Sequence, residues 1–347
     1  MQLVSFALDP RDPLVSRTRD AGPEDVPLDR HALRLGALLE YGEGGQAVVD
    51  LARALAVKLG REDAGAPEAE AESRIPADPR RFLEHGAPAL ASAREALAFA
   101  TAAVSDYEGP DLRSAGIVVP RSSVRLSSPV PQPGKLIGVA RNYADHARER
   151  GAASLPEEPV LFLKASSCVV GPRDDIVVPH AVTQPDYEGE LAVVVGSRAT
   201  AVGPREATAA IAGYCVANDV SARDYQNVRG QHFIGKSCDT FAPLGPALVT
   251  SDEIADPQDL GIRTRVSGEI RQEGRTKDML FSVAEIVAFA SHLFTLEPGD
   301  VILTGTPSGV GAASDPPRWL RDGDVVEIEI EGVGRLVNHV RFERGAS

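Results

Sequence analysis

Short apolar runs separated by glycine and proline dominate the second part of the chain. Residues 135–139, 159–163, 191–195, 247–250, 263–266, 301–304 and 325–330 have the length and side-chain types of β-strands. A helix is predicted from Ser282 to Leu293, because Ser282 and Glu285 form a capping box before a run with helical periodicity. Strands that do not alternate regularly with helices argue against a TIM barrel or a doubly wound sheet. The pattern predicts a mixed, β-rich α+β fold.

The N-terminal part has a different pattern. Apolar runs at 32–39 and 46–51 flank a glycine-rich stretch at 41–45, which predicts a hairpin followed by a helix over 52–59. Residues 60–79 are rich in Glu, Ala and Pro, so we predict an exposed loop there. A second helix is predicted over 80–104, broken near Gly86 and Pro88. Four prolines between 118 and 133 mark a boundary. We therefore expect a small α+β domain over 1–120 and a larger domain over 121–347.

Charge and cysteine content narrow the possible partners. The chain has 50 acidic and 36 basic residues, a formal net charge of −14, which opposes binding to a phosphate backbone. No run approaches the roughly 18 apolar residues of a membrane span, and the N-terminus lacks a signal-peptide pattern. Cys168, Cys215 and Cys238 lie far apart and lack metal-ligand spacing, as expected for reduced thiols. We expect a cytoplasmic protein with no nucleic-acid or membrane partner.

Three acidic residues at alternate positions, Asp186, Glu188 and Glu190, lead into the apolar run at 191–195. On a strand they would share one face, where like charges are tolerated only in water or around a cation. Taken alone, the row is more simply explained as a solvated strand edge. Asp219 ends a second apolar run and could complete an all-oxygen set that holds Mg²⁺ or Mn²⁺. On spacing alone, Asp219 is better explained as a strand-end cap or turn residue.

Residues 230–237, which begin at Gly230, match the phosphate-loop pattern G-x-x-x-x-G-K-[ST]. A true phosphate loop follows a buried strand and opens a helix. Here the preceding residues are largely polar, and two prolines and a glycine closely follow Ser237, which excludes a long helix. Nucleotide binding is therefore the weaker alternative. Lys236 remains of interest as a cation beside the proposed metal site.

Two further segments carry candidate chemistry. His146 and Glu149 are three residues apart, so on a helix they would share one face. A glutamate that accepts from one imidazole nitrogen makes the other nitrogen a better base, although such a pair alone is commonly just solvated charge. The predicted strand at 301–304 runs into a glycine-rich loop. Its N–H groups and hydroxyls can bind a carboxylate, or it can be a simple tight turn.

Taken together and in this order, these segments resemble the fumarylacetoacetate hydrolase superfamily. The resemblance is carried by residues 135–143, His146 with Glu149, and residues 162–164, 186–190, 218–224, 235–246 and 304–310. The N-terminal part is similar to the domain found in bacterial members that act as dienedioate isomerases or decarboxylases. The resemblance implies a β-rich roll over residues 121–347, and in most members a homodimer.

The resemblance also implies a cofactor and site residues. It places Mg²⁺ or Mn²⁺, for which Ca²⁺ can substitute in a crystal, on Glu188, Glu190 and Asp219, with Asp186 in support. It implies that His146 and Glu149 are a catalytic pair on a lid segment, that Lys236 is catalytic, and that the substrate-binding residues are Arg141, Tyr143, Gly305 and Thr306. Gly189 stands where many relatives have an apolar residue, so we expect a locally loosened strand.

The substrates implied by the resemblance are 2-oxo or 2,4-dioxo acids. The expected reaction is cleavage of a C–C bond in an acylpyruvate or fumarylpyruvate through a metal-stabilised enolate, by a hydrolase or lyase of aromatic catabolism. Oxaloacetate decarboxylation and the isomerisation or hydration of a 2-hydroxy-dienedioate are alternatives, because one enolate-stabilising site serves all of them. A metal-binding scaffold without activity is a third class.

Overall fold

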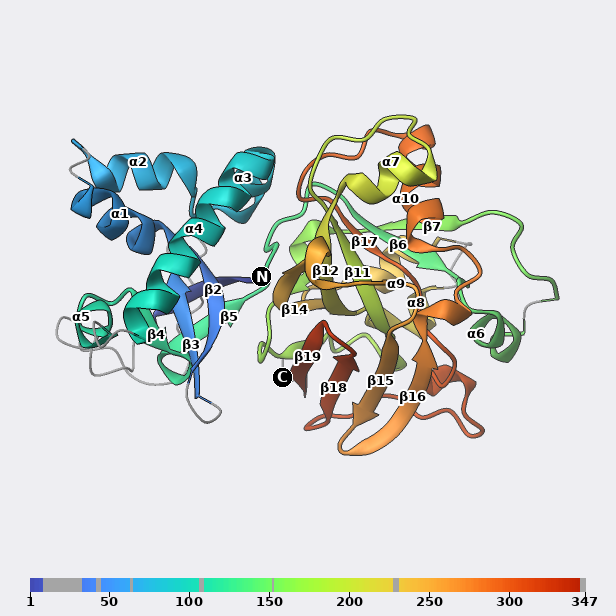
Figure 1. The fold of residues 1–347 in the computed structure, drawn as a ribbon. Coiled ribbons are helices and arrows are strands. Elements are labelled where there is room, and N and C mark those ends of the chain that lie inside the picture. Colours follow the sequence, from blue (N-terminus) through green and yellow to red (C-terminus); the bar gives the residue numbers. More distant parts are fainter. Residues whose placement is uncertain are drawn as a thin grey trace. The chain divides into compact units, whose positions relative to one another are not determined.

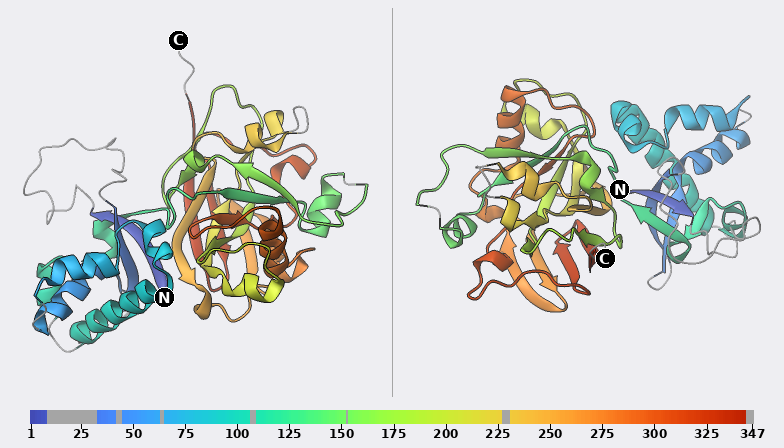
Figure 2. Two further views of the ribbon diagram at one scale, coloured as in Figure 1. Left: turned by 90° about the horizontal axis from the view of Figure 1, so that it is seen from above. Right: turned by 180° about the vertical axis from the view of Figure 1, so that it is seen from behind.

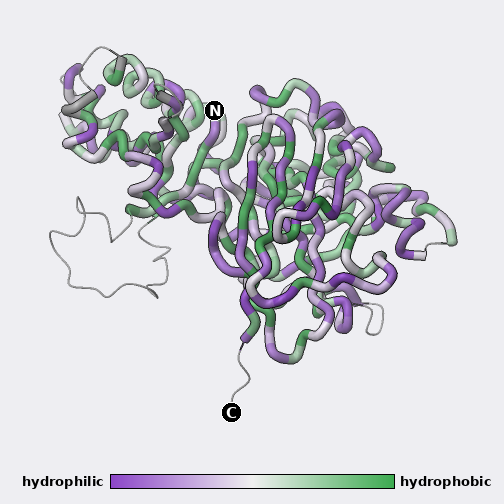
Figure 3. The backbone as a smooth tube through the Cα atoms, turned by 90° about the horizontal axis from the view of Figure 1, so that it is seen from below, coloured by the Kyte–Doolittle hydropathy of each residue, from purple (hydrophilic) through white to green (hydrophobic). Residues whose placement is uncertain are grey.

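The computed structural model describes residues 1–8, 33–41, 45–62, 65–105, 109–151, 153–226 and 231–343. The chain divides into two compact units, Met1–Pro129 and Val130–Ser347 (Figure 1). The division lies within the proline-rich segment at 118–133. Among the described residues no helix is long and apolar enough to cross a membrane. Hydrophobic and hydrophilic positions are interspersed along both units (Figure 3).

The first unit is an antiparallel sheet with helices packed beside it (Figures 1 and 2). The hairpin predicted around 41–45 is present, since Tyr41 pairs with Gly45. The helix predicted over 52–59 and the break near Gly86 are also present. The strands in sheet order are β4 (Val118–Pro120), β3 (Gly45–Asp50), β2 (Arg34–Tyr41), β1 (Gln2–Leu8) and β5 (Val124–Ser127), and the helices are α1 (Leu51–Arg61), α2 (Pro67–Arg74), α3 (Pro79–Glu84), α4 (Gly86–Ser105) and α5 (Gly109–Ser114).

The loop predicted over residues 60–79 is wrong, because this segment contains helix α2. Pro67 occupies the first turn, where its missing N–H is not needed, and two glutamates there face the positive end of the helix dipole. Arg74 in the last turn lies 2.7 Å from Glu95 of α4, and Ala71 is buried. Tertiary packing thus stabilises a helix that composition alone did not predict.

The second unit is built on two sheets. The first sheet has the order β14 (Ala242–Thr250), β12 (Ile211–Asn218), β11 (Gly189–Val195), β17 (Val301–Leu303), β6 (Leu136–Ala140) and β7 (Val160–Lys164), with β8 (Val169–Val170) beside β14. The second has the order β16 (Glu269–Arg275), β15 (Gly261–Val266), β18 (Val325–Ile330), β19 (Gly334–Phe342) and β9 (Ile176–Val178). Most neighbouring pairs are antiparallel, but β17 with β6, β14 with β8 and β19 with β9 are parallel. The predicted mixed, β-rich α+β fold is confirmed.

Short elements complete the second unit. The capping box predicted for Ser282 and Glu285 is present and begins α10 (Val283–Leu293). The other strands and α-helices in the described residues of this unit are β10 (Pro185–Asp186), paired with β13 (Ser221–Ala222), and the helices α6 (Ala144–Glu149), α7 (Pro204–Ala209), α8 (Arg223–Gln226) and α9 (His232–Lys236).

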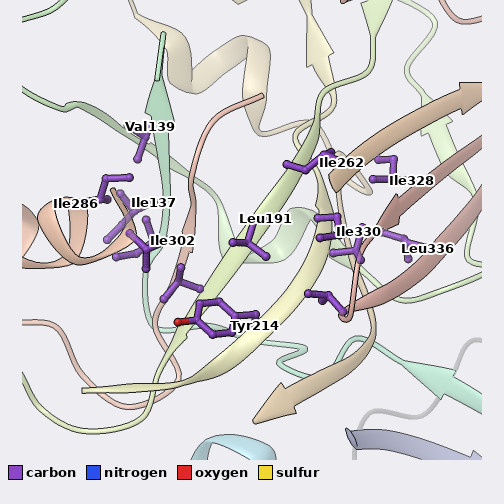
Figure 4. Packing of buried hydrophobic residues seen from close by; sticks show 14 of the residues in the cluster. Ile137, Val139, Leu191, Tyr214, Ile262, Ile286, Ile302, Ile328, Ile330 and Leu336 are labelled. Carbon is purple, nitrogen blue, oxygen red and sulfur yellow. The ribbon is translucent and has the colours of Figure 1, made fainter. Parts of the chain in front are cut away.

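Strand β11 runs through the middle of the core. All seven of its residues are buried, as expected for a strand covered on both faces. Figure 4 shows Leu191 of β11 between Ile286 of α10 on one side and Ile328 of β18 on the other. Burial of each such side chain stabilises the fold by about 1.5–3 kcal/mol. The acidic residues next to β11 are therefore held on a rigid strand.

Gly189 does not loosen this strand, contrary to expectation. A Cβ atom at Gly189 would lie 2.3 Å from Thr264 Oγ1 of β15 and 3.2 Å from Ile328 Cγ2 of β18. The Gly189 N–H donates to Gln272 Oε1 at 3.0 Å. Glycine therefore lets β11 lie against the second sheet at close range.

Candidate active site

The three acidic residues predicted to bind a metal come together in the structure. Glu188, Glu190 and Asp219 are 5%, 2% and 1% exposed, and they offer carboxylate oxygens within 4.8 Å of one another. Pairing of Gly189 on β11 with Asn218 on β12 brings these residues to one place. The solvated strand edge, favoured for the row alone, is wrong.

Two lysines neutralise part of this cluster. Lys236 Nζ lies 2.7 Å from Glu188 Oε2 and 2.6 Å from Asp219 Oδ2, and Lys164 Nζ lies 2.5 Å from Asp219 Oδ1. Burial lowers the pKa of the Lys236 ammonium, but the Asp219 and Glu188 carboxylates raise it by more, so its pKa lies above the usual value. Lys236 is therefore held as a cation. Sequence reasoning assigned no role to Lys164.

Asp186 lies behind the cluster and connects it to the loop after β17. Its carboxylate accepts from Gly311 N at 2.7 Å, from Ala312 N at 3.1 Å and from Arg223 Nε at 2.8 Å. Arg223 Nη2 also lies 2.7 Å from Glu188 Oε1. Asp186 thus fixes Arg223, and Arg223 holds Glu188.

The charges in this buried group do not cancel. Four carboxylates, those of Asp186, Glu188, Glu190 and Asp219, lie together, and within the described part of the chain the cations that form ion pairs with them are those of Lys164, Arg223 and Lys236.

Glu190 is the carboxylate with no ion-pair partner among the described residues, and it accepts a hydrogen bond from Gly305 N at 2.7 Å. Burial raises the pKa of Glu190 well above its usual range, and the Asp219 and Glu188 carboxylates raise it further. Burial also acts to raise the pKa of Glu188, but Lys236 and Arg223 bring it well below its usual range. A buried all-oxygen set with one uncompensated negative charge fits a hard divalent cation.

Helix α6 carries the predicted catalytic pair. His146 Nδ1 lies 2.8 Å from Glu149 Oε1, and His146 is 7% exposed. Gly309 N donates to both oxygens of Glu149, at 2.9 and 3.1 Å. A Cβ atom at Gly309, whose φ is 103°, would lie 2.1 Å from Arg271 O, so a side chain there would displace the loop. Glu149 therefore orients His146 and also ties α6 to the glycine-rich loop.

Most of the predicted site residues line one cavity of about 340 Å³. The predicted site residues in this lining are Arg141, His146, Glu188, Glu190, Lys236 and Thr306. Such a volume is at the small end of ligand sites and suits a small acid.

Two predicted substrate-binding residues lie outside this lining. Tyr143 is buried, and its hydroxyl has no partner among the described residues. Gly305 uses its N–H to bind Glu190.

The Arg141 backbone has φ 57°, a strained conformation of the kind found at functional sites.

The phosphate-loop alternative conflicts with the local structure. Helix α9 ends at Lys236, with Ser237 at its C-cap, whereas a phosphate loop would open a helix there. The Lys236 ammonium is also engaged by two carboxylates. Gly230 lies outside the described residues.

Sequence reasoning assigned no role to several residues of the site. Phe162, Arg223, Gln226 and His232 line the cavity, and Lys164 supports Asp219. One signal could have pointed to Lys164 and Arg223: several acids buried together require paired cations.

Comparison with known proteins agrees with this geometry. Residues 135–341 match the model of the fumarylacetoacetate (FAA) hydrolase C-terminal family. The mitochondrial oxaloacetate tautomerase FAHD2A of Homo sapiens is 44% identical over 268 residues, covering 77% of this chain and 80% of that protein. Oxaloacetate tautomerase YisK of Bacillus subtilis is 46% identical over 223 residues, covering 63% and 74%.

Solved structures of similar proteins agree with this family match. The structure of 2-hydroxyhepta-2,4-diene-1,7-dioate isomerase from Mycobacterium marinum has a TM-score of 0.66 and 30% identity, with 100% of each chain covered. Fumarylacetoacetate hydrolase from Exiguobacterium antarcticum has a TM-score of 0.66 and 32% identity, covering 99% of this chain and 100% of that one. The chain belongs to the fumarylacetoacetate hydrolase family.

Proposed function

We propose that the protein interconverts the keto and enol forms of oxaloacetate, or of a closely related 2-oxo dicarboxylic acid, with Mg²⁺ or Mn²⁺ as cofactor. The observation that carries this proposal is that one small cavity joins a histidine base, His146, to the buried carboxylate cluster and Lys236. The curated relatives named oxaloacetate tautomerases support it, because they are more than 40% identical over most of this chain.

Glu188, Glu190 and Asp219 would hold the cation, which when bound would supply Lewis-acid polarisation of the substrate's C2 carbonyl. With a dication bound and Glu190 ionised, these four carboxylates and three cations would sum to one net positive charge. Bound metal therefore favours an anionic substrate.

His146 is oriented to act as the base. A carboxylate only accepts hydrogen bonds, so Glu149 fixes the proton of His146 on Nδ1 and leaves the lone pair on Nε2. Nε2 would remove a proton from C3 of the keto acid and then deliver that proton to the C2 oxygen. The C3–H bond breaks, an O–H bond forms, the C3–H electron pair becomes the C2–C3 π bond, and His146 returns to its neutral state.

Lys236 would stabilise the oxygen that becomes negative between these two proton transfers. Its ammonium is already charged and fixed by Glu188 and Asp219, so little reorganisation is required when charge develops. Thr306 and Arg141, which line the same cavity, are proposed to bind the substrate carboxylate next to the 2-oxo group.

Cleavage of a C–C bond in a 2,4-dioxo acid remains a second candidate. The observation that favours it is the same His146–Glu149 pair, which can activate a water molecule as readily as it can remove a C3 proton. The tautomerase proposal has the better support, because the named relatives include tautomerases and an isomerase.

We also propose that the protein acts as a cytoplasmic homodimer. Leu163 on strand β7 is 52% exposed, and Phe233 and Ile234 on the adjoining helix α9 are 49% and 51% exposed. Exposed apolar side chains gathered on neighbouring elements are typical of an interface. Light scattering should give twice the 36.7 kDa chain mass, whereas a monomer across micromolar concentrations would contradict the proposal.

The reaction is tested by following decay of the oxaloacetate enol absorbance with Mn²⁺ present. His146→Ala should lower the catalysed rate by about 10²- to 10⁴-fold, the usual contribution of general acid–base catalysis. Asp145→Asn is a matched control, because Asp145 lies on the same helix with its side chain 80% exposed. Equal rates for His146→Ala and Asp145→Asn would contradict the assignment of the base.

A further inference from the structure

A second histidine, His232, lines the same cavity and has no part in the mechanism above. It begins helix α9, four residues before Lys236. His232 Nδ1 lies 3.2 Å from Gln226 Nε2, and Nε2 of His232 has no hydrogen-bond partner in the part of the chain that the structure describes. The chemistry of its ring therefore depends on which nitrogen carries the proton.

Gln226 determines that proton position. Arg223 Nη1 lies 2.8 Å from the Gln226 side chain, and a guanidinium can only donate, so the atom facing it must be the amide oxygen Oε1. The amide NH₂ group consequently points to His232 and donates to Nδ1. Because Nδ1 accepts, the proton of neutral His232 is on Nε2.

The orientation of Arg223 is itself well determined. Its Nε donates to Asp186 at 2.8 Å, and Nη2 lies 2.7 Å from Glu188, all among buried side chains. A continuous chain of hydrogen bonds thus runs from Asp186 through Arg223 and Gln226 to His232. It fixes the tautomer of His232 opposite to that of His146, so only His146 presents a lone pair as a base.

Packing holds the His232 ring in place. Its centroid lies 5.4 Å from that of Phe162, at an interplanar angle of 31°. Phe162 in turn lies against Gly138, where a Cβ atom would be 2.1 Å from Phe162 Cζ. Burial lowers the pKa of His232, and the nearby Lys236 cation lowers it further. Glu188 raises it, the effects of Arg141, which lowers it, and of Asp219, which raises it, are smaller, and the pKa stays below its usual value. A neutral ring is therefore favoured near pH 7.

We propose that His232 is a specificity residue that donates its Nε2–H to the second carboxylate of a dicarboxylic substrate. This inference rests on the proposed function, in which the first carboxylate and the 2-oxo group bind beside the acidic cluster. Lys236 is less available for the second carboxylate, because two carboxylates already engage its ammonium. His232 offers a free donor on the Phe162 side of the same cavity.

Binding of malate and lactate tests this assignment without requiring turnover. Both are 2-hydroxy acids, and only malate has the second carboxylate. Calorimetric titration of the full-length, Mn²⁺-loaded protein should show that His232→Phe, which keeps an aromatic ring against Phe162, reduces the preference for malate by about 10- to 100-fold. His232→Gln, which retains an N–H donor, should recover part of that preference. Gln231→Ala, an exposed neighbour, should leave it unchanged.

An unchanged malate-to-lactate ratio in His232→Phe, or an equal loss of affinity for both acids, would overturn the proposal. Nitrogen-15 NMR of histidine-labelled protein supplies a second readout, since His232 should carry its proton on Nε2, and a proton on Nδ1 would contradict the hydrogen-bond chain. The proposed reaction and the proposed role of His232 can be contradicted independently of each other. If the wild type does not tautomerise oxaloacetate while His232→Phe still loses malate preference, the proposed reaction is wrong and the role of His232 stands.

Discussion

Replacing Glu190 by glutamine removes one carboxylate of the cluster but keeps its shape and its ability to accept from Gly305 N. At the 4.8 Å limit that separates the cluster's oxygens, two unit charges repel by about 3 kcal/mol at an effective dielectric constant of 20. This repulsion and burial are the reasons that the pKa of Glu190 is raised. Without metal, wild-type protein should therefore bind a proton at Glu190 that the unfolded chain has already released.

The sign of the pH dependence follows from this difference in bound protons. The Glu190 contribution to stability is fully present below the usual pKa of 4.5 and is lost as the pH rises through the raised folded-state pKa. In that range the metal-free wild type should lose up to about 1.4 kcal/mol per pH unit relative to Glu190→Gln. The variant should therefore become the more stable metal-free protein as the pH increases.

Bound metal should make the wild type more stable than Glu190→Gln again. At a hundredfold excess over its Kd, a bound ion stabilises the native state by about 2.7 kcal/mol, which raises Tm by about 5–10 °C for a unit of this size. Differential scanning calorimetry with Mn²⁺ or with EDTA, between pH 6 and 8.5, measures both effects. Glu190→Gln should lose most of the Mn²⁺-dependent shift. A full shift in the variant would show that Glu190 does not bind the ion, and parallel loss of stability with pH in both metal-free proteins would show that Glu190 does not bind the proton.

Three further substitutions test separate parts of the structure. Lys236→Met should abolish turnover but tighten Mn²⁺ binding at least tenfold in calorimetric titration, because it removes the ammonium that competes with the ion for two carboxylates. Weaker Mn²⁺ binding would contradict this. Gly189→Ala should destabilise the fold by about 1–3 kcal/mol in urea, and Thr264→Ala in the same chain should restore part of the loss; additive effects would argue against their contact. Asp186→Asn should cost about 3–5 kcal/mol by leaving buried Arg223 incompletely paired, and an unchanged urea midpoint would argue against that pairing.

Most of the strands that sequence patterns predicted bury apolar side chains; β7, whose Val160 and Leu163 are exposed, is an exception. Strand β18 and its acidic outward face follow from the alternation in residues 325–330. Strand β16 was missed, because its sequence EIRQEGR is largely polar and much of it is exposed. Its position depends on backbone pairing with β15, which hydropathy does not record. The helix α2 was missed for a similar reason, since it depends on contact with α4.

As with the strands, some residues of the site could be predicted from the sequence and others could not. Glu188, Glu190 and Asp219 could be selected from the sequence, since unusual acids adjoin apolar runs and match a family pattern. Of the cations that make their burial possible, Lys236 was also selected, but Lys164 was not, because it is 55 residues from Asp219 along the chain. Glu149 binds Gly309 across 160 residues, a contact created by the sheet topology. Long-range pairings of this kind require the folded structure.

We expect this cavity to transfer a proton at C3 of a 2-oxo dicarboxylic acid without breaking a C–C bond. Proton NMR of oxaloacetate in D₂O with the Mg²⁺-loaded wild-type protein, compared with buffer that contains the same metal, measures both processes. Keto–enol interconversion should be faster and C3 should acquire deuterium, both effects should be lost in His146→Ala, and pyruvate should form no faster than in buffer. Enzyme-dependent release of pyruvate without accelerated exchange at C3 would show that the cavity breaks the C–C bond instead.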